Sequence, residues 1–129
     1  MKVILFAFLV FMTISCQDKM DRYVVKYEMV DINKTLIPDT TVNLDIMEIK
    51  AKAQADNGCW SNLYFELKKT SEFEYSLKAY GKYESFGACD DVIITKDTTI
   101  RFQPMQKGTY LFHISRIPGE TVTHTMIVE

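Results

Sequence analysis

Two histidines near the carboxyl end, His113 and His124, have the residue type and spacing to hold a metal ion. A Pro118-Gly119 turn lies between them, and pairing Arg116 with Thr121 across it would place the two imidazoles side by side, where they could bind zinc or copper. That register turns outward the apolar residues Val122, Met126 and Val128, whereas a one-residue bulge would turn them inward and separate the histidines. Because the neighbouring sequence offers no third ligand, we expect two ordinary strand histidines and keep the metal pair as the weaker alternative.

The amino-terminal segment has the pattern of a signal peptide. Lys2 and the free amino group form a basic start, and an apolar run follows from Val3 to Met12. A membrane-spanning helix would need about 20 apolar residues, and this run is well short of that length before the polar pair Gln17-Asp18. We therefore predict that the chain is exported.

The end of this segment, Thr13-Ile14-Ser15-Cys16, resembles the lipobox of bacterial lipoproteins in its looser, Bacteroidota-type form, since Leu is usual where Thr13 stands. The resemblance implies that residues 1–15 are a lipoprotein signal peptide and that Cys16 becomes the acylated first residue of the mature chain. Residues 16–21 would then be a lipidated tether to a membrane of the cell envelope, most simply the outer membrane. Plain secretory cleavage is the alternative.

With Cys16 assigned to lipid, the other two cysteines form an even pair. A disulfide between Cys59 and Cys89 is the default in an oxidising compartment, and it would close a loop of about 30 residues. The alternative is a catalytic thiol with one of the histidines as its base. The chain has neither a C-x-x-C spacing nor a recognisable nucleophile context, so we expect the disulfide.

A Cys59–Cys89 disulfide would gather polar and aromatic side chains at one rim of the domain. Four oxygen-bearing residues adjoin the cysteines, and calcium prefers such ligands: Asp56, Asn57, Asp90 and Asp91. Asx residues in turns usually bond to their own backbone, so we expect neither metal nor other cofactor. An aromatic surface near the rim could stack on a sugar or a protein partner, although Trp60 is expected to pack into the core: Trp60, Tyr64, Tyr80, Tyr83 and Phe86.

The elements that must position these residues are β-strands. From Arg22 onward no convincing helical period occurs, and β-branched or alternating runs recur about every ten residues between turn residues. The cleanest alternation places Phe73, Tyr75, Leu77 and Ala79 on one face. The sequence therefore predicts an all-β domain over residues 22–129, an antiparallel β-sandwich of about seven strands.

A motif near the carboxyl end, Lys107-Gly108-Thr109-Tyr110-Leu111-Phe112, looks like the start of the sixth strand in immunoglobulin-like sandwiches. The resemblance implies that Tyr110 forms a tyrosine corner, with its ring in the core and its hydroxyl bonded to the main chain. The core cysteine that this family places two residues later is Phe112 here, so the likeness is to immunoglobulin-like architecture in general.

Composition fits one globular domain and argues against one class of partner. The formal net charge of −2 is unlike that of a nucleic-acid-binding domain, which needs clustered Lys and Arg. Phosphate-binding glycine loops and Ser-His-Asp signatures are absent, and we expect no enzyme. The sequence predicts a lipid-anchored binding or interaction module of the bacterial envelope, with a protein or glycan ligand. A structural subunit of an envelope assembly is the alternative.

Overall fold

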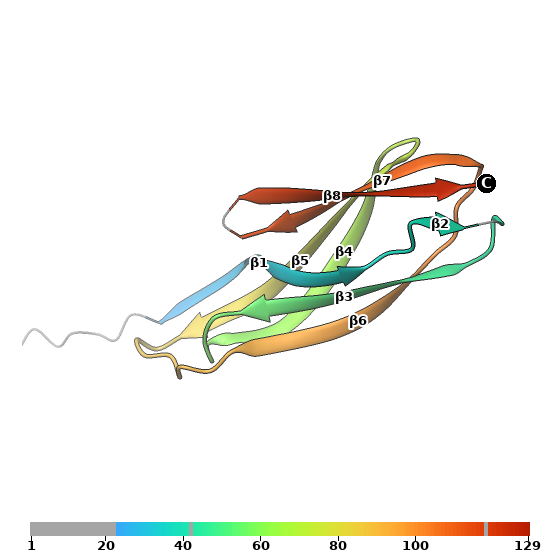
Figure 1. The fold of residues 1–129 in the computed structure, drawn as a ribbon. Coiled ribbons are helices and arrows are strands. Elements are labelled where there is room, and N and C mark those ends of the chain that lie inside the picture. Colours follow the sequence, from blue (N-terminus) through green and yellow to red (C-terminus); the bar gives the residue numbers. More distant parts are fainter. Residues whose placement is uncertain (1–22, 42, 118) are drawn as a thin grey trace, which may run out of the picture.

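The computed structural model describes residues 23–41, 43–117 and 119–129, so the predicted signal peptide, Cys16 and the tether lie outside the described residues. Within them the regular elements are eight β-strands, which Figure 1 shows as one strongly curled sheet: β1 (Val24–Leu36), β2 (Thr40–Thr41), β3 (Met47–Ala55), β4 (Trp60–Ser71), β5 (Glu74–Ser85), β6 (Ile94–Phe102), β7 (Gly108–Arg116) and β8 (Glu120–Val128). No helix in this part of the chain is long and apolar enough to cross a membrane. The prediction of an all-β fold is confirmed.

Strand β1 joins the two layers of the fold. Its first half pairs with β5, from Val24 opposite Ser85 to Val30 opposite Ala79, and its second half pairs with β3. The first layer therefore contains β4, β5, β7, β8 and the short β2, and the second contains β3 and β6. The two layers enclose the core, as in a β-sandwich.

Two of the strand pairings are parallel, which the prediction of an antiparallel sandwich did not include. Strand β7 runs parallel to β5, from Glu74 opposite Leu111 to Leu77 opposite Ile114, and β2 runs parallel to β8. Parallel neighbours need a long crossover connection. Here the chain crosses to β6 in the second layer between β5 and β7, and that excursion supplies the connection.

An aromatic cluster fills the core between β5, β6 and β7. The ring of Tyr75 lies 4.9 Å from that of Phe102 and 5.7 Å from that of Phe112, and Phe102 and Phe112 are 5.3 Å apart. Alternate residues of β3 face the same core: Met47, Ile49, Ala51, Ala53 and Ala55. Tight packing of this kind makes the core sensitive to any change in volume.

The tyrosine corner is present. Tyr110 is buried, and its hydroxyl donates a hydrogen bond to the carbonyl oxygen of Gln106 at 2.7 Å. The backbone N–H of Gln106 donates to the same hydroxyl at 3.3 Å. These bonds satisfy a buried polar group and hold the approach to β7 against the core, as the immunoglobulin-like resemblance implied.

An ion pair fixes the point at which β1 changes layers. Both carboxylate oxygens of Asp31 accept hydrogen bonds from the Arg116 guanidinium, at 3.1 and 3.2 Å, and one also accepts from the backbone N–H of Ile117 at 3.1 Å. The hydrogen bond from Arg116 is the main cause that lowers the pKa of Asp31 below its usual range. The bond ties the end of β7 to the middle of β1.

Acidification should therefore weaken the fold through Asp31. A carboxyl group whose pKa is lowered by folding contributes stability that is complete above its unfolded pKa, about 4, and is lost as the pH falls through the folded value. We expect wild type to lose stability relative to Asp31→Asn as the pH falls from about 5 to about 2, measured by urea unfolding at several pH values. A stability difference that stays constant over this range would contradict the prediction.

Candidate functional site

The predicted disulfide is formed. Cys59 and Cys89 are bonded with their Cα atoms 5.2 Å apart, and they join the start of β4 to the loop between β5 and β6, residues 86–93. Backbone hydrogen bonds reinforce the connection: the N–H of Gly58 donates to the carbonyl oxygen of Asp90 at 2.8 Å, and that of Glu84 donates to Cys59 at 2.9 Å. This end of the fold, at which β1 begins, is called the disulfide end below (Figure 1).

The oxygen-bearing residues of the predicted rim meet here but do not converge on one point. The side-chain oxygen of Asn57 accepts the N–H of Cys59 at 3.0 Å, and its amide donates to Asp56 at 3.1 Å. Asp90 contributes its backbone carbonyl, and both Asp90 and Asp91 are exposed. No group of three or more His, Cys, Asp or Glu residues in the described part of the chain could hold a metal ion. These residues stabilise the two turns, as Asx residues commonly do.

The aromatic residues of the rim divide into two groups. Trp60 is partly buried against the core and meets the ring of Tyr83 edge-on at 5.3 Å. The Tyr83 hydroxyl lies 3.3 Å from the sulfur of Cys89, so this pair supports the disulfide from the inner side. Phe86, by contrast, is 67% exposed and packs on the ring of Tyr23 at 4.6 Å. Only the second group is open to a ligand.

A β-bulge in β4 brings a further aromatic pair to the outer surface. Asn62, which has a positive φ of 50°, and Leu63 together occupy the space opposite Gly81, so the alternation of β4 changes phase. Leu63 is thereby turned into the core and Tyr64 outward, where its ring stacks on Tyr80 at 5.5 Å. A Cβ on Gly81 would lie 2.6 Å from the Leu63 side chain, which explains the glycine.

Strand β1 extends this surface with residues that sequence reasoning missed. Its outward side chains lie opposite the outward ones of β5: Met29 faces Tyr80, and Tyr27 faces Lys82. Tyr27 is 66% exposed and Tyr64 47%. Together they form a continuous surface on the outside of the first layer, called the aromatic face below: Tyr23, Val25, Tyr27, Met29, Tyr64, Tyr80 and Phe86. Alternation of large apolar residues from Tyr23 to Met29 was the pattern that could have identified it.

A charged network positions the Tyr23 end of the aromatic face. The Glu84 carboxylate accepts a hydrogen bond from the Tyr23 hydroxyl and forms a 2.9 Å ion pair with Lys82. The bond from Tyr23 is the main cause that lowers the pKa of Glu84, and Lys82 adds to it. The pair is neutral in sum, so the exposed rings, not a net charge, characterise this face.

The two candidate metal-binding histidines do not meet. His124 lies opposite Phe112, and His113 opposite Thr123, because the register between β7 and β8 pairs Arg116 with Glu120 and not with Thr121. His113 lies between Thr123 Oγ1 at 3.0 Å and Glu74 Oε1 at 3.3 Å, whereas His124 lies 3.2 Å from Asp39 Oδ1. In this register Met126 and Val128 are buried, as the predicted separation of the histidines required, whereas Val122 near the end of the strand is 47% exposed. The register itself, with no bulge between β7 and β8, produces the separation.

Comparison with family models, curated proteins and solved structures finds no match to this chain. The aromatic face gathers several exposed aromatic residues on one side of the sheet, and exposed apolar patches of this kind mark sites of interaction.

Proposed function

We propose that the protein is an exported, lipid-anchored β-sandwich whose aromatic face binds a protein partner in the bacterial envelope. The observation that carries this proposal is the aromatic face, on which Tyr27, Tyr64 and Phe86 are each about half or more exposed although large rings are normally buried. Aromatic residues are enriched at the centres of protein interfaces, where they bury much area at a small cost in side-chain entropy.

Export is supported by the disulfide and by the amino-terminal sequence. Disulfides such as Cys59–Cys89 persist in oxidising compartments and are rare in the cytosol. The lipobox-like sequence before Cys16 supplies the anchor, and acylation at that residue would attach the domain stably to a membrane.

The anchor would hold the aromatic face close to the membrane. Only six residues separate Cys16 from Tyr23, and the seven residue-to-residue steps between them span at most about 25 Å. Tyr23 is itself part of the aromatic face, since its ring packs on Phe86 at the disulfide end. A partner embedded in or lying along the same membrane could reach this face.

Site-specific photo-crosslinking in the native envelope tests the surface. A p-benzoylphenylalanine at Tyr27 should crosslink one partner band, whereas the same group at Met105, which is even more exposed but lies away from the aromatic face, should not. Adding Tyr64→Ala should reduce the yield about tenfold or more, since a central aromatic contact is worth about 2 kcal/mol or more. Equal crosslinking from both positions would contradict the proposal, as would a band that Tyr64→Ala leaves unchanged.

Replacement of Cys16 tests the anchor separately. Cys16→Ser should move the protein from the membrane fraction to the soluble fraction, because attachment is expected through acyl chains on that sulfur. Continued attachment would contradict acylation at Cys16. The purified Cys16→Ser protein can still be tested for partner binding, so a failure of the anchor and a failure of the aromatic face give different results.

A further inference from the structure

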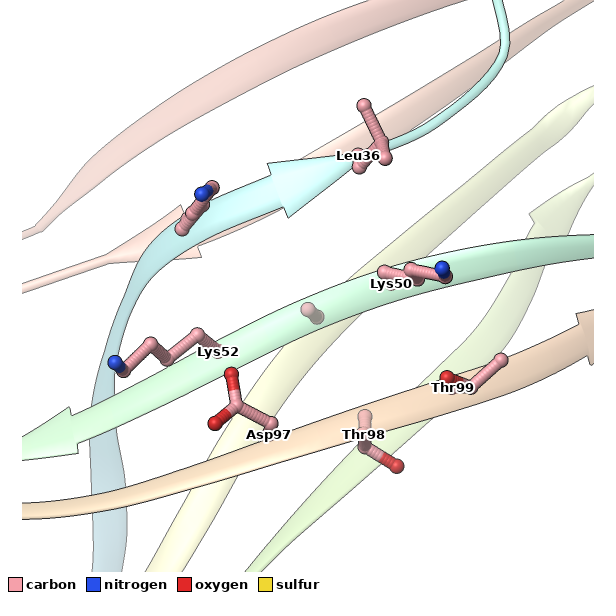
Figure 2. Close-up of a pocket in the computed structure, with 8 residues that line it drawn as sticks. Leu36, Lys50, Lys52, Asp97, Thr98 and Thr99 are labelled. Atoms are coloured by element: carbon pink, nitrogen blue, oxygen red, sulfur yellow. The ribbon is translucent and has the colours of Figure 1, made fainter.

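A second surface, on the opposite layer, has different chemistry. The outer face of the layer formed by β1, β3 and β6 is hollowed into an open groove with a volume of about 420 Å³. Figure 2 shows Lys50 and Lys52 on β3 beside Asp97 and Thr99 on β6, with Leu36 at the end of β1. Lys34 lines the same groove. We call it the lysine groove.

A bulge in β1 is responsible for the third lysine. The register between β1 and β3 shifts after Ile32, which faces Ala53, so that the next pair is Lys34 with Lys52. Regular alternation from the buried Ile32 would have turned Lys34 toward the core. The bulge instead directs it outward and places it directly opposite another lysine.

This arrangement is unfavourable for the isolated protein. Like charges directly opposite each other on neighbouring strands destabilise a sheet. Lys52 faces Lys34 on one side and Asp97 on the other, while Lys50 faces only Leu36 and Thr99. Among the described residues, no carboxylate forms an ion pair with any of the three ammonium groups. The groove is therefore positively charged in a chain whose net charge is −2.

The side chains that line the lysine groove indicate which class of ligand it could bind. Lysine ammonium groups bind carboxylate and phosphate oxygens as point charges. The Thr99 hydroxyl and the Asp97 carboxylate can exchange hydrogen bonds with ligand hydroxyl groups, and Leu36, 63% exposed, offers an apolar contact beside them. The volume lies in the range of small-molecule sites. A ligand that pairs with the lysines, exchanges hydrogen bonds with Thr99 and Asp97, and also contacts Leu36 carries several hydroxyl groups as well as negative charge.

We propose that the lysine groove binds an anionic saccharide, a sugar or short oligosaccharide that bears carboxylate or phosphate groups. Its negative groups lie against Lys34, Lys50 and Lys52, and its hydroxyl groups face Asp97 and Thr99. This site is separate from the aromatic face and depends neither on the partner proposed there nor on the lipid anchor.

Isothermal titration of the full-length mature protein in a non-ionic detergent tests the proposal. The probes are trigalacturonate, glucose 1,6-bisphosphate, inorganic phosphate and neutral maltotriose. We expect saturable binding of at least one of the two anionic sugars, weakened as salt is raised from about 50 to about 300 mM. Preference for trigalacturonate or for the bisphosphate distinguishes a carboxylated from a phosphorylated ligand.

Matched variants assign any binding to the groove. Lys34→Gln/Lys50→Gln/Lys52→Gln should weaken binding about tenfold or more, whereas Lys68→Gln/Lys69→Gln/Lys78→Gln, which removes the same charge from β4 and β5, should leave it within about twofold. The groove variant should melt no lower than wild type, because it removes a like-charge pair. Equal weakening by both variants overturns the proposal. So does the absence of binding by both anionic sugars up to about 10 mM, or equally tight binding of phosphate or maltotriose.

Discussion

Replacing both Cys59 and Cys89 by serine is expected to lower the free energy of unfolding by about 3 to 4 kcal/mol. The disulfide closes a loop with a sequence separation of 30, and its removal restores the corresponding freedom to the unfolded chain. The hydrogen bonds between Gly58 and Asp90 and between Glu84 and residue 59 use backbone atoms only, so they remain available in the variant. The loss is therefore mainly a property of the unfolded state.

Urea unfolding of the wild type and the double-serine variant measures this loss. Wild type unfolded with an excess of reducing agent should match the variant, because both lack the same covalent link. A difference between oxidised and reduced wild type below about 1 kcal/mol would show that the loop is already restricted in the unfolded chain, and would contradict the prediction.

Phe112→Ala is expected to cost about 3 to 5 kcal/mol. The Phe112 side chain is fully buried and lies in the aromatic cluster with Tyr75 and Phe102, which cannot collapse easily into the space it leaves. The penalty combines the lost burial of the ring with the cavity that remains. For a domain of this size, a loss of that magnitude is a large part of the total stability.

Phe86→Ala is the matched control, since it removes the same atoms from a ring that is 67% exposed. It should cost about 1 kcal/mol or less, from the contact with Tyr23 alone. Both variants are compared with wild type by urea unfolding. Similar losses for Phe112→Ala and Phe86→Ala would contradict the core assigned here.

Short patterns in the sequence predicted much of the fold. The alternation around Tyr75 and Leu77 identified a strand with a buried face, the motif around Tyr110 implied the corner that is observed, and the cysteine count indicated the disulfide. The buried face, the tyrosine corner and the disulfide each depend on the chemistry of a few residues that the sequence shows directly. The parallel direction of the β5–β7 pair does not, because β7 lies beside β5 only after the chain has crossed through β6 in the other layer.

The lysine groove depends on a feature that alternation alone does not specify, because the bulge before Lys34 turns that lysine outward. The outward direction of Tyr64 follows from the alternation with Leu63 and Phe65, but the bulge at Asn62 that precedes this run does not. Gly81 lies within β5, where a larger residue would collide with the side chain of Leu63. Packing against a partner strand decides where a bulge forms and where a glycine is needed, and alternation within a single sequence does not reveal either.

The path of β1 also determines how the domain responds to mechanical force. The strand begins at the disulfide end and the carboxyl terminus lies at the far end of the molecule, so tension between the two termini acts along β1 (Figure 1). Its pairs with β5, from Val24 to Val30, would then be loaded in shear and would have to rupture together instead of one after another. A force applied between the two ends of the domain would therefore be resisted first through this strand.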